Sequence, residues 1–206
     1  QYESGSQDEG RAFVYLGSAA GLDLTAAWTA DGDRDWAYFG SAASSAGDVN
    51  GDGCDDVVVG SPAASSLGVY SRAFLYLGSS SGLDSMAAWS TEWPQLHVGF
   101  ASAVSSAGDV DGDGFDDIVI GAPNTTDGGV ALFYLGSSTG PRQGPVYLSA
   151  EPGGFGTSLA AADVNADGFG DVIVGSPHHD HGSTDEGRAY LYLGAPLDSD
   201  LDGVPN

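Results

Sequence analysis

The chain has 206 residues, with 29 Asp and Glu against five Arg and no Lys, which gives a formal net charge of −24 at pH 7. This balance argues against nucleic-acid binding, which needs a basic surface, and against charge-driven adhesion to anionic membranes. The sequence has no run of about 20 apolar residues, so we expect no membrane span. Cys54 is the only cysteine, which excludes a disulfide within the chain.

Four similar apolar segments recur about every 60 residues, a period typical of propellers and solenoids. They read "GRAFVYLG", "SRAFLYLG", "GVALFYLG" and "GRAYLYLG", and they end at Gly17, Gly78, Gly136 and Gly194. Their content of Val, Phe, Tyr and Leu predicts strands. Arg11, Arg72 and Arg188 recur near the start of three of these segments, which favours structural ion pairs with nearby acids.

Between successive copies the sequence predicts three further strands. A turn of small residues leads to a short apolar patch at 26–28, 87–89 and 146–148, then to a strand introduced by Phe-Gly or Phe-Ala, an acidic loop and a Val/Ile-rich strand. We therefore expect an all-β fold with four strands per repeat and no helix. The runs "VVV", "IVI" and "VIV" are expected to be buried on both faces. The aromatic residues expected to pack between sheets are Trp28, Trp89, Tyr15, Tyr76, Tyr134 and Tyr192.

The three acidic loops share one pattern: "DVNGDGCDD" (48–56), "DVDGDGFDD" (109–117) and "DVNADGFGD" (163–171). Each has Asp or Asn at positions 1, 3, 5 and 9 and Gly at position 6, where a sharp bend needs a positive φ. Alternating oxygen ligands on a tight loop, with a backbone carbonyl at position 7, are typical of Ca²⁺ sites of the EF-hand kind. The predicted side-chain and carbonyl ligands are Asp48, Asn50, Asp52, Cys54 and Asp56; Asp109, Asp111, Asp113, Phe115 and Asp117; and Asp163, Asn165, Asp167, Phe169 and Asp171.

An alternative for each loop is an Asx-rich turn without an ion. The third loop departs from the pattern, with Ala166 at position 4 and Gly170 at position 8, so we expect its site to be the weakest. Cys54 contributes its carbonyl, and we interpret its thiol as a small buried filler.

These motifs together resemble the FG-GAP repeats of integrin α subunits and of secreted bacterial proteins. The pairs Phe39-Gly40, Phe100-Ala101 and Phe155-Gly156 precede the loops, and "GSP" or "GAP" follows each of them at 60–62, 121–123 and 175–177. The resemblance covers nearly the whole chain and implies four-stranded β-propeller blades with calcium in the inter-strand loops. Within residues 1–197 it divides the chain into repeats at approximately 1–62, 63–123 and 124–177, with a closing strand in 178–197.

The chain is expected to hold about three and a half blades, whereas a closed propeller needs about four to eight. An incomplete propeller leaves unpaired strand edges, which proteins normally cover. The chain is therefore expected to be part of a larger one, to complete a ring with a second copy, or to join copies end to end in a filament.

The C-terminal stretch "DSDLDGVPN" (198–206) resembles the acidic calcium repeats of thrombospondin type 3. Asp198, Asp200, Asp202 and Asn206 would bind a fourth Ca²⁺; the alternative is a disordered acidic tail.

Two other groups of residues are candidate sites. Trp36 and Trp93 lie in variable stretches where an aromatic platform for a sugar or peptide would lie, although packing is the simpler interpretation. His178, His179 and His181 flank Asp180 in "HHDH", which we interpret as an exposed polar loop rather than a transition-metal site.

No catalytic motif is present and the repeated acids are already assigned to calcium, so the chain is not expected to be an enzyme. The first functional hypothesis is a secreted, self-associating structural protein whose calcium ions stabilise its loops. The alternative is an extracellular adhesion module that binds a glycan or a protein. Extracellular modules bind Ca²⁺ in the range of about 10⁻⁴–10⁻³ M, so we expect a secreted or cell-surface protein whose signal peptide has been removed.

Overall fold

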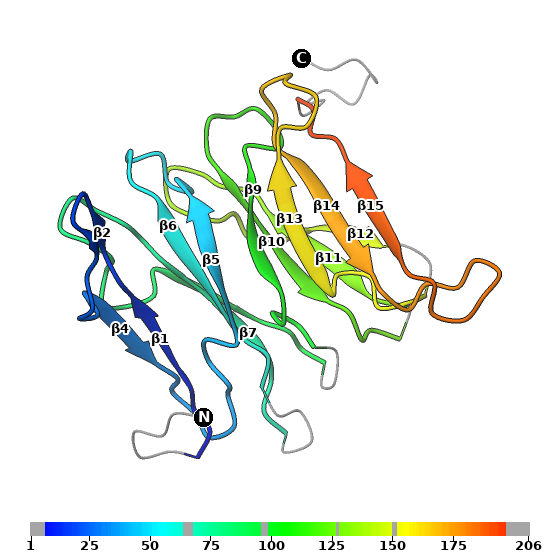
Figure 1. Ribbon diagram of the computed structural model, residues 1–206, viewed down its shortest axis with the longest axis horizontal. Coiled ribbons are helices and arrows are strands. Elements are labelled where there is room, and N and C mark those ends of the chain that lie inside the picture. The colour runs from blue at the N-terminus through cyan, green and yellow to red at the C-terminus, as the bar shows by residue number, and fades with distance from the viewer. Residues whose placement is uncertain (1–6, 64–67, 96–98, 127, 150–151, 197–206) are drawn as a thin grey trace.

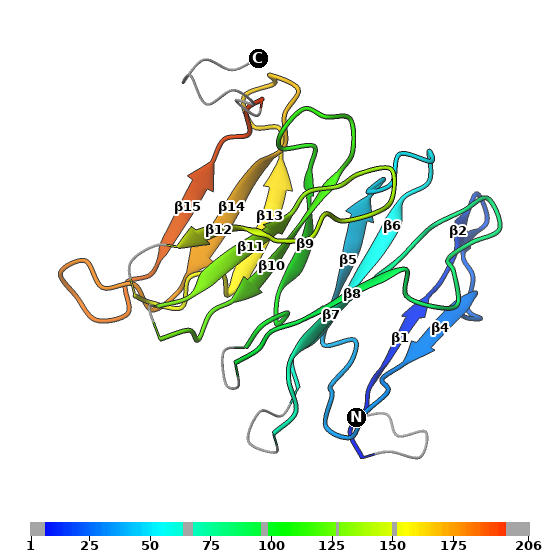
Figure 2. The same cartoon turned by 180° about the vertical axis from the view of Figure 1, so that it is seen from behind.

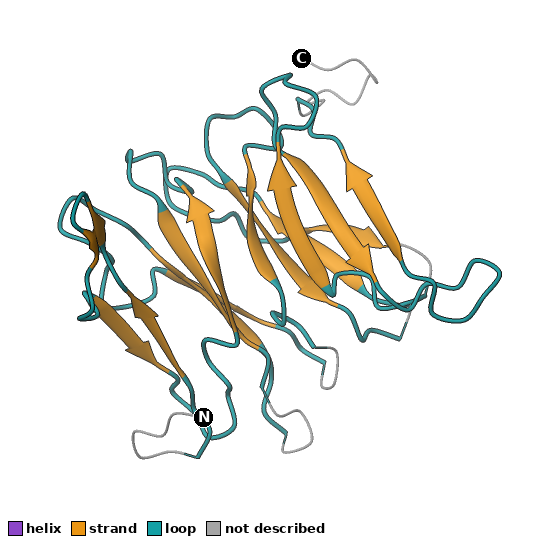
Figure 3. Cartoon of the chain, in the orientation of Figure 1, coloured by secondary structure: helices purple, strands orange, loops and turns teal. Residues whose placement is uncertain are grey.

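The computed structural model describes residues 7–63, 68–95, 99–126, 128–149 and 152–196. These residues form strands and loops and no helix, which confirms the all-β prediction (Figure 3). Among them no helix is long and apolar enough to cross a membrane. The C-terminal loop-like stretch 198–206 lies outside the described residues, so its calcium site stays a prediction.

The strands of the three larger sheets pair antiparallel with their neighbours in sequence. An N-terminal pair is formed by β1 (Arg11–Val14) and β4 (Trp28–Asp31), which are joined through the short hairpin of β2 (Gly17–Ser18) and β3 (Gly21–Leu22). The first full sheet contains β5 (Ala42–Gly47), β6 (Asp56–Ser61), β7 (Arg72–Tyr76) and β8 (Trp89–Glu92). The second full sheet contains β9 (Val104–Gly108), β10 (Asp117–Ala122), β11 (Val130–Tyr134) and β12 (Val146–Ser149). The last sheet has β13 (Ser158–Ala162), β14 (Asp171–Ser176) and β15 (Arg188–Tyr192).

The sheets stand side by side in a row that runs from the N-terminal pair to the last sheet (Figure 1). The first strands of successive sheets contact each other, β5 with β9 and β9 with β13 (Figure 2). Glycines in the second strands also let β6 and β10 approach the segments that lead into the next sheet. A Cβ on Gly60 would lie 2.1 Å from the carbonyl oxygen of Ala101, and one on Gly121 would lie 2.0 Å from that of Gly156.

Neighbouring sheets pack through the two faces of their second and third strands. Because side chains alternate along a strand, Val59, Phe74 and Tyr76 face the N-terminal pair, whereas Val58 and Leu75 face the second full sheet. The same alternation recurs one sheet further along, where Val119, Ala131 and Phe133 pack against Val172 and Val174. The expected burial on both faces is thus confirmed for "IVI", with Ile118, Val119 and Ile120 fully buried. In "VVV" it holds for Val58 and Val59, whereas Val57 is half-buried.

The two ends of the row depart from this expectation. Tyr15 is 45% exposed and Ile173 is 37% exposed, although we expected both to be buried. Tyr15 lies on the outer face of the N-terminal pair together with Phe13, and Ile173 is paired with Leu191, which is 52% exposed, on the last sheet. No described sheet lies beyond either face, so these apolar side chains have no neighbouring sheet to pack on.

Aromatic contacts between sheets follow the repeat until the last interface. Trp28 meets Tyr76 edge-on with ring centroids 4.8 Å apart, and Trp89 meets Tyr134 in the same way at 4.9 Å. In the second full sheet, Val146 lies opposite Phe133. The equivalent position in the first full sheet, opposite Leu75, is occupied by Trp89. A cavity of about 290 Å³ adjoins Val146 and Tyr192.

We expect Val146→Trp to stabilise the chain by about 1 kcal/mol, because an indole would occupy part of this cavity and meet Tyr192, as Trp28 meets Tyr76 and Trp89 meets Tyr134. Urea unfolding measures the change. Val164→Trp, at another exposed Val outside the cavity, is the matched control and should give no gain. A loss of stability in V146W would show that the cavity does not accept the ring.

Candidate metal sites in the acidic loops

Each acidic loop connects the first and second strands of a sheet, and its ninth residue opens the second strand. In every loop the carboxylate at position 1 turns inward onto backbone amides. Asp48 accepts hydrogen bonds from the amides of Asp52 (3.0 Å) and Gly53 (2.8 Å). Asp109 and Asp163 accept the corresponding bonds in the second and third loops. Gly53, Gly114 and Gly168 have positive φ angles of 87°, 89° and 94°, as predicted for position 6.

The Asp at position 9 anchors the base of each loop. Asp117 is fully buried and accepts hydrogen bonds from the amides of Val110 (2.9 Å) and Gly136 (2.8 Å). Asp56 and Asp171 are also fully buried and make the equivalent pairs of bonds. These carboxylates therefore tie each loop to the turn after the third strand, a structural role that the sequence alone did not reveal. Burial raises the pKa of Asp117 to about 7, and it also raises the pKa of Asp56.

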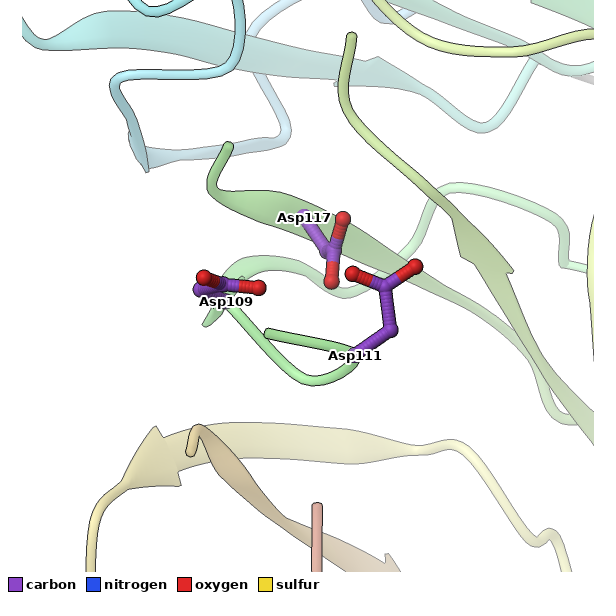
Figure 4. Close-up of side chains that lie close together, drawn as sticks. All are labelled: Asp109, Asp111 and Asp117. Atoms are coloured by element: carbon purple, nitrogen blue, oxygen red, sulfur yellow. The ribbon is translucent and has the colours of Figure 1, made fainter. Parts of the chain in front are cut away.

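The second loop brings three carboxylates together (Figure 4). One oxygen each from Asp109, Asp111 and Asp117 lie within 4.8 Å of one another. The Asp111 side chain is only 2% exposed, and its Oδ2 is buried without a hydrogen-bond partner. Burial, followed by the charge of Asp113, raises the pKa of Asp111. A buried carboxylate oxygen without a partner is costly, and a bound cation would remove that cost. An all-oxygen ligand set of this kind fits Ca²⁺.

In the first and third loops, position 3 is an Asn that supports position 5. The Asn50 amide donates to Asp52 at 3.0 Å, and the Asn165 amide donates to Asp167 at 2.7 Å. In the second loop, Asp113 is instead paired with Arg142, which comes from the turn after β11. Arg142 is not among the site residues predicted from the sequence.

The carbonyl ligands expected at position 7 stay predictions. The amides of Cys54, Phe115 and Phe169 each donate to the carboxylate at position 5 of their own loop. Cys54 is half-buried rather than buried, and desolvation followed by the nearby Asp52 charge raises the pKa of its thiol.

The three loops are also linked to one another. The Asp116 amide donates to the Asp48 carbonyl (3.1 Å), and the Asp116 carboxylate accepts from the Asp48 amide (2.8 Å). The Gly170 amide donates to the Asp109 carbonyl at 2.8 Å. A Cβ at Gly170 would lie 2.2 Å from the Ala107 carbonyl oxygen, which explains why the third loop has Gly where the second has Asp116.

The Phe at position 7 packs on the preceding loop. A Cβ at Gly51 would lie 2.7 Å from the Phe115 ring, and one at Gly112 would lie 2.4 Å from the Phe169 ring. Position 4 of the third loop is Ala166, which takes a φ of +60°, and no described loop follows to pack on it.

We expect Gly112→Ala to destabilise the chain by about 2 kcal/mol, because the new methyl group meets the Phe169 ring and the backbone φ of +76° disfavours any side chain. Gly114→Ala is the control: its φ is +89° but its Cβ would meet nothing within 4 Å, so it should cost about 1 kcal/mol. Equal losses of stability in thermal unfolding would contradict the ring contact.

Other predicted residues have mixed outcomes. Arg11 pairs with Asp31 and Arg72 pairs with Asp33, which confirms two of the expected ion pairs. The "HHDH" stretch is not uniformly exposed as predicted, because His179 is only 1% exposed and lies near Tyr190. His178 is exposed and pairs with Asp185 at 3.1 Å.

Trp93 is half-buried and stacks on Phe100 with ring centroids 5.5 Å apart, which confirms packing for this residue. Its Nε1 is buried without a hydrogen-bond partner. Trp36 is half-buried and has a φ of +61°.

Comparison with known proteins identifies the repeats. The family model described as FG-GAP repeat matches residues 39–76, 100–148 and 155–192. Integrin alpha-4 of Xenopus laevis is 31% identical over 181 residues, which cover 82% of this chain and 17% of that protein. Human Integrin alpha-IIb is 35% identical over 70% of this chain and 15% of that protein.

A further relative has an enzyme's name. Phosphatidylinositol-glycan-specific phospholipase D of Dictyostelium discoideum is 28% identical over 84% of this chain and 21% of that protein. The chain thus spans about a fifth or less of the length of these relatives. Its sheets are integrin-α-like propeller blades, and the chain belongs to the FG-GAP repeat family.

Proposed function

We propose that the chain is an extracellular calcium-binding module, in which each of the three acidic loops holds one Ca²⁺ through the ligands predicted from its sequence. The observation that carries this proposal is the buried Oδ2 of Asp111, which has no hydrogen-bond partner and belongs to a group of three carboxylates. The second loop is therefore the best-supported site. The other two follow from the same inward-turned position 1 and the same position 5 geometry.

The bound ions would act by stabilising the folded blades. Clustered carboxylates on a chain of net charge −24 repel one another, and divalent cations relieve that repulsion. At about 1 mM Ca²⁺ and a dissociation constant of about 10⁻⁴ M, each site would contribute about 1 kcal/mol. The proposal assigns this chain no catalytic step.

Thermal unfolding in calcium and in EDTA tests this function. The wild-type chain should unfold at a higher temperature in calcium. Asp52→Asn, which keeps an acceptor for the Cys54 amide, should lose part of that difference while changing little in EDTA. Asp23→Ala removes the same charge from an exposed turn outside the loops and serves as the control. Identical wild-type unfolding temperatures with and without calcium would contradict the proposal.

The exposed end faces support a role in assembly. At the N-terminal end, Phe13 and Tyr15 occupy the repeat positions of Phe74 and Tyr76, which face the preceding sheet inside the row. At the other end, Ile173 and Leu191 occupy the positions of Val58 and Leu75, which face the following sheet. The two ends therefore present the two halves of an internal interface. We propose that further blades cover these faces, either from a second copy joined end to end in a ring or filament, or from the rest of a longer chain. Sedimentation in calcium distinguishes these two sources of blades. If copies join end to end, the wild-type chain should self-associate and Leu191→Asp should abolish the association. A wild-type chain that stays monomeric would leave the rest of a longer chain as the source of the covering blades.

An adhesion or ligand-binding role is the second candidate, and one groove favours it. A cavity of about 510 Å³ lies between the two full blades and is lined by aromatic and polar side chains, including Trp89, Trp93, Tyr147, Glu92 and Gln143. Aromatic faces beside hydrogen-bonding groups suit a sugar or a peptide. Binding to a glycan array should be lost in Tyr147→Ala. Tyr147 is 58% exposed, so the fold should tolerate this substitution. Retained binding in that variant would place the ligand elsewhere.

A further inference from the structure

The second loop differs from the other two in how its position 5 carboxylate is supported. In the first loop the Asn50 amide donates to Asp52 Oδ2, and the third loop has the same bond between Asn165 and Asp167. Position 3 of the second loop is Asp111, whose ionised carboxylate has no proton to donate. Replacing Asn by Asp therefore removes a donor and places a further negative charge beside Asp113.

Arg142 supplies what this replacement removes. Its Nη2 donates to Oδ2 of Asp113, and its Nη1 lies 3.9 Å from Oδ2 of Asp111. The guanidinium is thus directed at the two carboxylates that distinguish this loop from the others.

Arg142 has two equivalents in the described turns, and neither of them is a base. The amides of Asp23, Asp84 and Arg142 bond to the carbonyls of Leu16, Leu77 and Leu135 at 2.8, 2.9 and 2.8 Å, so the three residues occupy equivalent places. The N-terminal pair and the first full sheet have an acid where the second full sheet has a base. Among the described residues, Asp111 and Arg142 therefore occur together in the second full sheet, whereas the first has Asn50 and Asp84 in these two places.

We propose that Arg142 sets the calcium affinity of the second loop, as a built-in counter-ion that replaces the Asn amide and offsets the charge of Asp111. This inference rests on the proposed calcium function. With Arg142 in place, the side-chain ligands and the guanidinium together carry the same net charge as the ligands of the first and third loops. The second site then binds Ca²⁺ less tightly than its four carboxylates would on their own.

Removing Arg142 has two opposing effects, and the geometry decides between them. Loss of the guanidinium removes a repulsive charge next to the ion, which tightens binding. It also removes one support of Asp113. That carboxylate still accepts the Phe115 amide through Oδ1, and Asp111 still accepts the Asp113 amide, so both side chains remain oriented. We therefore expect removal of Arg142 to increase the calcium affinity of the second loop about tenfold at low ionic strength. The increase should be smaller at higher salt, which screens the charge.

The experiment follows calcium titrations through the amide resonances of Gly53, Gly114 and Gly168, which donate to position 1 of their own loops. Arg142→Gln should lower the calcium midpoint at Gly114 about tenfold and leave those at Gly53 and Gly168 unchanged. Asp111→Asn should raise the Gly114 midpoint. The double variant, which recreates the Asn-containing loop without the arginine, should return it to within about threefold of wild type.

Arg34→Gln is the matched control, because Arg34 pairs with Glu92 away from the loops. It should leave the Gly114 midpoint unchanged. In chelator, R142Q should lower the unfolding temperature by exposing Asp111 and Asp113 to each other, and the double variant should recover it.

The outcomes separate this inference from the proposed function. If all three loops titrate in wild type but R142Q leaves the Gly114 midpoint unchanged or raises it, the role of Arg142 is overturned and the calcium function stands. If none of the three amides responds to calcium in the wild-type chain, the calcium function and this inference fail together.

Discussion

Replacing Asp117 with Ala is expected to lower the free energy of unfolding by about 3–5 kcal/mol, both in calcium and in EDTA. The carboxylate is fully buried and accepts the amides of Val110 and Gly136, so its removal leaves two donors without their acceptor. Urea unfolding in the two buffers measures both losses.

The comparison with Asp52→Asn makes this result specific. Asp52 is more exposed and is predicted to act mainly as a ligand, so its loss should matter in calcium and little in EDTA. If Asp117→Ala also lost stability only in calcium, Asp117 would be a ligand without the anchoring role that its hydrogen bonds indicate.

The calcium-free chain is expected to become less stable as the pH rises from about 4 to 7. Burial raises the pKa of Asp117 from 3.8 to about 7, so in this window the folded chain binds a proton that the unfolded chain has released. Below about pH 4 this raised pKa contributes its full stabilisation to the folded state. That stabilisation is lost as the pH rises through 7. A shift of this size corresponds to about 4 kcal/mol as an upper limit. Asp56 and Asp111 have pKa shifts in the same direction.

Calcium should reverse this pH dependence, because the ion binds the ionised carboxylates. Urea unfolding at pH 5 and pH 8, in EDTA and in calcium, tests both signs. Asp117→Asn, a neutral isostere, should flatten the slope in EDTA. A calcium-free wild-type chain that gains stability from pH 5 to pH 8 would contradict the buried, protonated Asp117.

The strands and loops could be predicted because their signals are local. The continuous Val and Ile runs predicted the central strands, and the recurring "YLG" and Phe-Gly motifs predicted four strands per repeat, as in β5 to β8. The positive φ of Gly53 follows from the sharp bend at position 6 alone. These features depend on residues within one repeat, and the same pattern occurs in three copies along the chain.

Features that depend on neighbouring blades could not be predicted in this way. Ile173 has the same pattern around it as Val58, but it is exposed because no described blade follows it. Asp116 contacts the Asp48 backbone of the preceding blade, and only the packing of the sheets brings it there. Arg142 pairs with Asp113 of its own blade, but the two residues are distant in sequence and meet only once the strands of that sheet are paired. The one available signal for Arg142 was a base in a turn where the equivalent residues, Asp23 and Asp84, are acids.

Anomalous X-ray diffraction from crystals grown in saturating calcium tests the central claim most directly. The account predicts an ion in each loop, about 2.3–2.6 Å from side-chain oxygens at positions 1, 3 and 5. In the second loop these belong to Asp109, Asp111 and Asp113. Maps that show all three loops without an anomalous peak would contradict it.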